Sequence, residues 1–275
     1  MAGGPPGGWS PTTPTDDTYF PCPAYVWHML DGRTCLVTGA SRGIGRGVAK
    51  ELGDHGADVV INYRSSEELA HEVSDEIEDD CDGRAIPAQA DVSNMAEVEA
   101  MVEAVRDEWG PIDVLVNNAG ITVDKKFANM TREDWQRVID VNLGGVFNCT
   151  KTCFDDICEA EDGRLVNISS VVGQQGNYGQ ANYATTKSGL FGFTRTIALE
   201  MASSGSTANC VAPGFVATDM LETVPERVQE KILDRIPLNR FATVDDVAGI
   251  IRFLASEDSS YMTGQILAVN GGMEW

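Results

Sequence analysis

The stretch "TCLVTGASRGIGRGVAKELG", residues 34–53, decides the fold class of the chain. It opens with a short apolar run and a glycine-rich turn, and its later apolar residues, Ile44, Val48 and Leu52, recur at helical spacing. The stretch therefore predicts a strand, a tight turn and a helix. Small residues in such a turn let the backbone approach a pyrophosphate, while the first turn of the helix offers N–H donors.

The three glycines of this turn, Gly39, Gly43 and Gly45, have two possible meanings. They could serve only a tight connection between strand and helix, or they could form the binding site of a dinucleotide. The turn follows the first strand of a βαβ unit, which is where dinucleotides bind in open α/β sheets. This context favours the binding site.

Strands and helices continue to alternate along the rest of the chain. The pattern predicts further strands at 57–63, 84–92, 112–120, 163–170, 206–214 and 265–272, and helices at 66–80, 95–109, 132–157, 181–203 and 244–256. Near-continuous apolar strands separated by amphipathic helices indicate a doubly wound parallel sheet with helices on both faces. We expect an α/β fold with one domain and no internal repeat.

Residues 1–28 are rich in proline and glycine and lack the basic start of a secretory signal. We expect them to form a mobile N-terminal extension, with the folded domain at 29–275. Met29 stands just before that domain and is a candidate natural start, in which case the extension is absent from the natural protein. No run of about 18 apolar residues occurs, so no spanning helix is expected.

The charge of the chain limits its partners. Asp and Glu number 42 against 20 Lys and Arg, which gives a formal net charge of −22. Such a field disfavours nucleic acid and anionic membranes. The acids are dispersed rather than gathered into a tail, so we favour a protein adapted to a salt-rich, halophilic cytoplasm over a merely soluble acidic protein.

Seven cysteines are present, an odd number without a C-x-x-C pair. Neither a metal site nor a redox motif is therefore expected. Cys149, Cys153 and Cys158 lie near helical spacing and have no nearby histidine, so we interpret them as core residues. The pattern indicates a reducing, cytoplasmic compartment.

The residues after the second strand indicate the cofactor. An acidic residue normally meets the ribose 2′-hydroxyl of NAD at this place, but the segment here reads "INYRSS". Arg64 beyond the strand and Arg42 in the glycine turn could both pair with a 2′-phosphate, which an acid would repel. We therefore expect NADPH. The alternative is that both arginines merely balance an acidic surface.

Further motifs follow in a fixed order: "NNAG" (117–120), "VNL" (141–143), "NISS" (167–170), "YATTK" (183–187) and "PG" (213–214). With "TGASRGIG" they resemble the short-chain dehydrogenase/reductase family over residues 31–275. The resemblance implies a single-domain Rossmann fold and an NADPH-dependent oxidoreductase. Most members are homotetramers, so a homotetramer is expected here too, with the C-terminal "LAVNGGMEW" at a subunit interface.

The resemblance also implies a catalytic tetrad of Asn142, Ser170, Tyr183 and Lys187. Ser170 rather than Ser169 takes the role, because it lies 13 residues before Tyr183, the spacing usual in the family. Ser170 would hydrogen-bond the substrate carbonyl, and Asn142 would hold a water that links the lysine to solvent. Each residue alone has an ordinary structural explanation; the four together behind a cofactor turn favour catalysis.

The cofactor contacts implied by the resemblance come from the glycine turn, the ends of the following strands and the segment after "PG". Asp91 would contact the adenine. The full set is Thr38, Gly39, Ser41, Arg42, Gly43, Ile44, Gly45, Tyr63, Arg64, Asp91, Val92, Asn118, Ala119, Gly120, Tyr183, Lys187, Pro213, Gly214, Val216 and Thr218.

The spacing of Tyr183 and Lys187 suits proton donation. A free tyrosine has a pKa of about 10 and donates its proton sluggishly near neutral pH. Lys187 lies one helical turn later on the same face. We expect its charge to lower the pKa of Tyr183.

Within the family, the segments around 120–148 and 169–190 look most like reductases of 3-oxoacyl thioesters. Two substrates compete: acetoacetyl-CoA, reduced for polyhydroxyalkanoate synthesis, and 3-oxoacyl chains on acyl carrier protein, reduced for fatty acid synthesis. Family members that use the carrier present arginines where this chain has Glu161 and Ser204, which favours CoA. Against CoA, Ala128 and Asn129 replace a basic pair.

The acyl pocket is expected from Ser170 and Tyr183 together with the residues that match the acetoacetyl-CoA enzymes. Those are Asn177, Tyr178, Gln180 and Phe215. A small polar pocket suits a four-carbon acyl group. The alternative from another class is a non-catalytic NADP(H)-binding sensor, although such proteins usually lose the tyrosine or the lysine, and this chain keeps both.

Overall fold

The computed structural model describes residues 29–218, 221 and 224–274 of the chain. The predicted extension, residues 1–28, lies outside the described residues, so its mobility and the start at Met29 stay predictions.

Seven parallel strands form one sheet in the order β3-β2-β1-β4-β5-β6-β7. From β1 the chain moves outward to β2 and β3, then crosses back to β4 and winds outward on the other side. This order confirms the doubly wound sheet and leaves a crevice where the winding reverses. The strands are β1 (Thr34–Val37), β2 (Asp58–Tyr63), β3 (Ala85–Gln89), β4 (Val114–Asn117), β5 (Arg164–Ile168), β6 (Thr207–Pro213) and β7 (Ile266–Val269).

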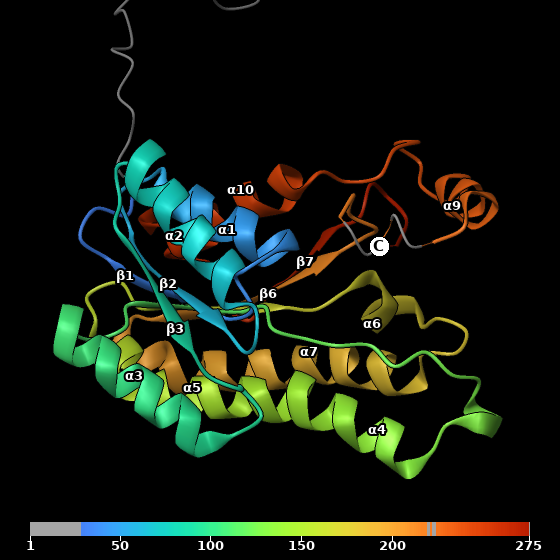
Figure 1. Ribbon diagram of the computed structural model, residues 1–275, viewed down its shortest axis with the longest axis horizontal. Coiled ribbons are helices and arrows are strands. Elements are labelled where there is room, and N and C mark those ends of the chain that lie inside the picture. Colours follow the sequence, from blue (N-terminus) through green and yellow to red (C-terminus); the bar gives the residue numbers. More distant parts are fainter. Residues whose placement is uncertain (1–28, 219–220, 222–223, 275) are drawn as a thin grey trace, which may run out of the picture.

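Helices cover both faces of the sheet (Figure 1). One face packs against α1 (Gly43–Gly53), α2 (Glu67–Asp80) and α10 (Val244–Ala255). The other packs against α3 (Met95–Trp109), α5 (Gly145–Glu159) and α7 (Ala181–Met201). The Rossmann fold is thus confirmed, and these helices lie within a few residues of the ranges predicted from the sequence.

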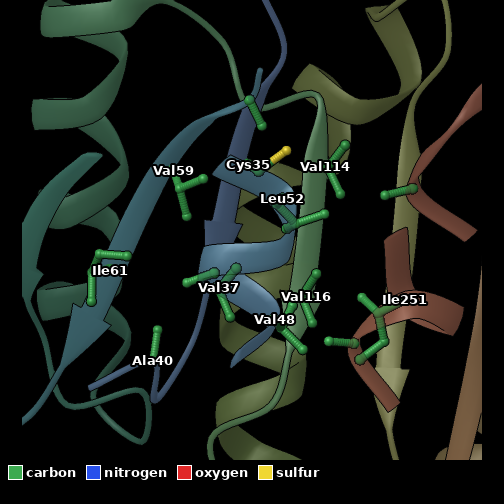
Figure 2. Packing of buried hydrophobic residues seen from close by; sticks show 14 of the residues in the cluster. Cys35, Val37, Ala40, Val48, Leu52, Val59, Ile61, Val114, Val116 and Ile251 are labelled. Carbon is green, nitrogen blue, oxygen red and sulfur yellow. The ribbon is translucent and has the colours of Figure 1, made fainter. Parts of the chain in front are cut away.

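The core consists of two layers of aliphatic side chains, one on each face. Figure 2 shows the first layer, where Val37 of β1 lies among Val48 of α1, Val116 of β4 and Ile251 of α10. All four are completely buried. Burying one such side chain stabilises the fold by about 1.5–3 kcal/mol, which explains why β1 and β4 read as continuous apolar runs.

The helix predicted at 132–157 is interrupted in the structure. It comprises α4 (Arg132–Ile139), a π-helical turn η2 (Asp140–Gly144) and α5. Thr131 and Asp134 form a capping box at the start of α4, as Thr243 and Asp246 do for α10. The π turn carries Asn142 and lets its side chain reach inward, a departure from α geometry that apolar periodicity does not reveal.

Two helices near the crevice were not predicted. α6 (Val171–Gln175) is only five residues long, too short to show a helical repeat. α9 (Glu226–Leu233) has apolar residues at helical spacing, Val228 and Ile232, but none of its residues is buried. The remaining short elements are the 3₁₀ turns η1 (Phe127–Asn129), η3 (Ala202–Ser204) and η4 (Glu257–Ser259).

The cysteines of the described chain are unbridged. Cys149 and Cys153 are buried in the core of the α3–α5 face, as predicted, and Cys158 packs against that core from its edge. Across the described residues, no helix combines the length and apolar character needed to cross a membrane. The same residues contain no cluster of three or more His, Cys, Asp or Glu side chains arranged to hold a metal ion.

Candidate active site

The glycine turn lies at the carboxyl end of β1 and is held by Asn118. The amide Nδ2 of Asn118 donates to the carbonyl oxygens of Thr38 at 2.9 Å and Gly39 at 3.1 Å. A Cβ on Gly45 would lie 2.4 Å from the Gly39 oxygen. Gly39 and Gly43 have φ values of +62° and +57°, which glycine adopts readily. The fold of the turn therefore requires all three glycines.

Two more side chains tie this turn to the neighbouring strands. The Thr38 hydroxyl accepts the N–H groups of Asn118 at 2.9 Å and Ala119 at 3.0 Å. Asn62, at the end of β2, accepts the N–H of Gly39 at 3.2 Å and donates to the Ala90 carbonyl at 3.2 Å. Sequence analysis did not assign a role to Asn62, because only the fold brings the ends of β1, β2 and β3 together.

The first turn of α1 suits an anion. It begins at Gly43 without a side-chain cap and without an acidic residue. In α3, α4 and α10, by contrast, the preceding side chain accepts an N–H of the first turn. Open N–H groups and the positive end of the helix dipole favour an anion at such a place. The turn therefore fits the pyrophosphate of a dinucleotide.

The cations predicted to choose the cofactor lie at the outer edge of this turn. The Arg64 guanidinium is 3.8 Å from the carboxylate of Asp91, and its side chain is about half exposed. Arg42 immediately precedes α1 and is exposed. Both guanidinium groups are accessible to a 2′-phosphate, and Asp91 lies beside that of Arg64. The residues present thus fit NADPH.

The segment after β6 returns to the glycine turn. Gly214 packs so closely on β7 that a Cβ would lie 2.9 Å from the Cα of Asn270. Val216 then pairs with Ala242 in an isolated bridge. The methyl group of Thr218 is 3.8 Å from where a Cβ of Gly43 would stand. The described part of the predicted nicotinamide segment "PGFVATDM" (213–220) therefore lies beside the start of α1, and its last two residues lie outside the described residues.

The two serines after β5 have different surroundings. Ser169 is buried, and its hydroxyl donates to the Lys187 carbonyl at 2.7 Å. Ser170 caps α6 by accepting the Val172 N–H at 3.1 Å, and it hydrogen-bonds the side chain of Tyr183. The structure therefore brings Ser170, and not Ser169, to the tyrosine.

Tyr183 and Lys187 lie one turn apart near the start of α7. The Lys187 ammonium lies 5.7 Å from the centre of the Tyr183 ring and donates to the Ile168 carbonyl at 2.6 Å. Burial lowers the pKa of Lys187 from 10.5 to about 8, while the nearby Cys210 thiol acts in the opposite direction. Lys187 is therefore still mostly protonated at neutral pH.

The pKa of Tyr183 differs from the expectation. It is raised rather than lowered, because burial of the phenol outweighs the hydrogen bond from Ser170, and the charge of Asp124 raises it further. The ammonium of Lys187 is held by the backbone of β5 and lies over the ring of Tyr183. Tyr183 is thus fully protonated near neutral pH, which is the form that donates.

Asn142 lies behind these residues and is completely buried. Its Oδ1 accepts the Ile121 N–H at 2.8 Å, and its Nδ2 donates to the Ile121 carbonyl at 3.0 Å and to the Thr186 hydroxyl at 3.2 Å. A Cβ on Gly120 would be 3.4 Å from the Asn142 Oδ1 and 3.6 Å from the Lys187 Nζ. The end of the "NNAG" motif, Asn142 and Lys187 therefore meet at one point.

Two of the three residues predicted to form one pocket wall, Asn177 and Gln180, are joined by a hydrogen bond just before α7. Asn177 donates to Gln180 at 2.9 Å, and the Gln180 amide donates to both carboxylate oxygens of Asp124, at 2.9 and 3.0 Å. Tyr178 projects outward, with 80 % of its side chain exposed. Sequence analysis missed Asp124, because nothing in "GITVD" marks a contact with a helix more than 50 residues later.

Phe215 lines a cavity of about 410 Å³ with Ile236, Leu238 and residues that follow β7. Asn177, Tyr178 and Gln180 do not line that cavity. That Phe215 lines the acyl pocket together with these three residues stays a prediction.

Comparisons with known proteins agree with this geometry. A family model described as enoyl-(acyl carrier protein) reductase matches residues 39–274. The chain is 47 % identical over 242 residues to a 3-oxoacyl-[acyl-carrier-protein] reductase FabG of Staphylococcus aureus, covering 88 % of this chain and 98 % of that protein. It is 49 % identical over 245 residues to a 3-oxoacyl-[acyl-carrier-protein] reductase of Synechocystis, covering 89 % and 98 %.

A 3-oxoacyl-[acyl-carrier-protein] reductase FabG of Staphylococcus epidermidis is 44 % identical over 242 residues, covering 88 % of this chain and 98 % of that protein. The chain belongs to the short-chain dehydrogenase/reductase family. It is an NADPH-dependent oxidoreductase of that family, which confirms the enzyme class and cofactor predicted from the motifs.

Proposed function

We propose that the chain reduces the 3-oxo group of an acyl chain carried as a thioester on acyl carrier protein, giving the 3-hydroxyacyl thioester. The observation that carries this proposal is the meeting of Ser170, Tyr183 and Lys187 at one site, in a fold whose α1 begins with an open first turn. The names of relatives 44–49 % identical over nearly their whole length support the carrier-bound substrate.

The proposed chemistry divides among the side chains. NADPH, when bound along the α1 turn, supplies the hydride that reaches the carbonyl carbon. Ser170 donates a hydrogen bond to the carbonyl oxygen and stabilises the charge that develops there. Tyr183 gives its proton to the same oxygen. A buried phenol keeps that proton until the oxyanion forms, because its pKa is raised.

Lys187 and Asn142 support the tyrosine in this proposal. The ammonium at the ring face stabilises the phenolate that remains after proton donation. Asn142 is fixed by Ile121 and Thr186, and Gly120 leaves space between it and Lys187. We propose that a proton returns to Tyr183 past Asn142 and Gly120, by way of Lys187.

Acetoacetyl-CoA is the second candidate substrate. The exposed residues at the two positions where carrier-using members present arginines are Glu161 and Ser204, so the docking surface expected for a carrier is missing there. The preference for CoA drawn from these two positions is outweighed by the relatives, whose names specify the carrier. A role in polyhydroxyalkanoate synthesis would follow only if the chain used the CoA thioester.

Parallel kinetics decide between the substrates. Oxidation of NADPH at about 340 nm would be followed with acetoacetyl carrier protein and with acetoacetyl-CoA at equal concentration. We expect kcat/KM to be at least about tenfold higher with the carrier protein. Both substrates present the acyl group on the same pantetheine arm, and the carrier protein adds contacts of its own. A preference for CoA would support the second candidate, and no oxidation with either would favour the NADP(H)-binding sensor.

Two further expectations belong to this proposal. We propose a homotetramer, supported by family membership and by the exposed Phe147 on α5 and Leu199 on α7, large apolar side chains that a partner would cover. We also propose a reducing, cytoplasmic location, supported by the unbridged cysteines of the described chain. Light scattering and fractionation of the natural cells test these two points.

A further inference from the structure

The loop between β4 and α4 presents cations in a strongly acidic protein. Residues 125–137 contain Lys125, Lys126, Arg132 and Arg137 against the acids Glu133 and Asp134, whereas the whole chain has 42 acidic and 20 basic residues. We name Lys125, Lys126 and Arg132 the basic rim.

Not all of the rim's charge is neutralised within the protein. Lys125 forms an ion pair with Asp134, with an N–O distance of 2.7 Å. Lys126 and Arg132 are exposed, and neither makes an ion pair with another described residue. The Lys126 ammonium instead lies 5.9 Å from the centre of the Tyr178 ring. Two cations thus remain available to an outside partner.

The basic rim lies at the mouth of the active site. The N–H of Lys125 donates to the Gly179 carbonyl at 2.8 Å, which joins the rim to the loop that precedes α7. That loop contains Asn177, Tyr178 and Gln180, and Tyr183 follows within one turn of α7. In Figure 1 the start of α4 and the loop after α6 lie at the same end of the molecule.

Two aromatic side chains accompany the cations. Phe127 has 76 % of its side chain exposed and Tyr178 has 80 %. Cations beside exposed aromatic rings are typical of surfaces that bind an acidic protein, because the rings bury apolar area while the cations meet carboxylates. Near Glu161 and Ser204, in contrast, a carrier would find no cation at either position.

We propose that the basic rim, with Phe127 and Tyr178, docks the acidic carrier protein whose acyl thioester enters the site. This inference rests on the proposed function and adds the surface that recognises the carrier. The rim takes over the task that arginines at the positions of Glu161 and Ser204 perform in carrier-using members of the family. Its cations also raise the local concentration of an acidic partner around a chain that otherwise repels it.

The test compares a carrier-bound substrate with one that has no carrier. The double variant Lys126→Gln/Arg132→Gln removes two charges at the rim. The control Lys50→Gln/Arg84→Gln removes one lysine from the last turn of α1 and one arginine from just before β3, at the end of the sheet opposite the crevice. We expect the rim variant to raise KM for acetoacetyl carrier protein by about threefold to tenfold at about 0.1 M salt. The kinetics with acetoacetyl-N-acetylcysteamine should stay within about twofold.

The control variant should leave KM for the carrier unchanged, and about 1 M KCl should shrink the effect of the rim variant. An unchanged KM for the carrier, or an equal rise with the small thioester, overturns the proposal. An equal rise of KM with acetoacetyl-CoA would assign the rim to the phosphate of the pantetheine arm that both substrates share. A changed oligomeric state of the rim variant would assign the rim to a subunit interface. Either result contradicts carrier docking. If the wild type reduced neither thioester, the proposed function itself would fail.

Discussion

Lys187 is buried as an ammonium, and the cost of that burial depends on pH. Its pKa is about 8 in the folded chain against an ordinary value of 10.5. Between these two pH values the unfolded chain binds more protons, so this residue makes the free energy of unfolding rise as pH increases through the interval. Below about pH 8 both states hold the proton, and the full cost of burial is present.

Lys187→Met should remove this dependence. The free energy of unfolding of the wild type minus that of the variant should increase by about 2 kcal/mol between about pH 7.5 and about pH 10. Loss of the hydrogen bond to Ile168 changes this difference in the free energy of unfolding by the same amount at every pH, so it does not affect the dependence on pH. Urea unfolding at several pH values measures it; a difference that is flat or falls with pH contradicts the burial of a charged Lys187.

The cofactor preference is also decided by single residues. Arg64→Ala should lower the ratio of kcat/KM with NADPH to kcat/KM with NADH by about tenfold, because a charge-assisted contact to the 2′-phosphate is lost. Arg42→Ala should act in the same direction. Arg84, paired with Asp58 at the other end of β2, provides the matched control Arg84→Ala. An unchanged ratio in both test variants would show that these arginines only balance surface charge.

The choice of Ser170 over Ser169 shows what a residue pattern can predict. Spacing in the chain selected Ser170, and the structure brings that serine to Tyr183. The direction in which the pKa of Tyr183 is shifted was not predictable from residue spacing. It depends on the burial of the phenol and on the charge of Asp124, which accepts hydrogen bonds from the Gln180 amide.

At the scale of elements, the site depends on how closely α6 packs on α7. A Cβ on Gly173 of α6 would lie 2.8 Å from the backbone carbon of Lys187 and 3.0 Å from its Cβ. The Ser188 hydroxyl donates to the Gly173 carbonyl at 2.5 Å, which locks the contact. A glycine at this point therefore fixes the distance between Ser170 at the start of α6 and the Tyr183–Lys187 turn.

Gly173→Ala should push α6 away from α7. We expect a loss of about 1–3 kcal/mol in the free energy of unfolding and a lower kcat, because the hydrogen bond between Ser170 and Tyr183 is strained. Gly249→Ala is the control, since α10 has open space at Gly249 and alanine favours a helix. A Gly173→Ala enzyme with normal stability and kcat would show that this packing does not position the site.

Core helices were predictable from the sequence because their apolar spacing reports burial. α3 was predicted with its observed bounds, Met95–Trp109. The interruption at η2 and the short α6 carry no such signal, yet they position Asn142 and Ser170. The local backbone geometry at these places depends on contacts with segments that are distant in the sequence. Asn142, for example, is held by a hydrogen bond to the Ile121 carbonyl.

For the whole molecule, the formal charge of −22 is the dominant surface property. Helix α2 illustrates it, with exposed Glu72, Asp75 and Asp79 following one another on a helical face. Like charges at such spacing destabilise a helix, and salt weakens the repulsion as the Debye length falls from about 10 Å at 0.1 M to about 3 Å at 1 M. Adaptation to a salt-rich cytoplasm stays a prediction that this repulsion makes testable.

The free energy of unfolding should increase by several kcal/mol between about 0.1 M and about 1 M KCl. The triple variant Glu72→Gln/Asp75→Asn/Asp79→Asn should be about 1 kcal/mol more stable than the wild type at low salt and should show a smaller salt dependence. Urea unfolding at both salt concentrations measures this. Equal stability at both would contradict adaptation to salt.

The measurement that tests the central claim most directly is NADPH oxidation by the wild type and by Tyr183→Phe with acetoacetyl carrier protein. The side chain of Tyr183 is the proposed proton donor, and removing one hydroxyl leaves the α1 turn and the basic rim intact. We predict oxidation by the wild type and a kcat lower by about 10²- to 10⁴-fold in the variant, with the dissociation constant for NADPH unchanged. A variant that keeps a near-normal kcat would contradict the account.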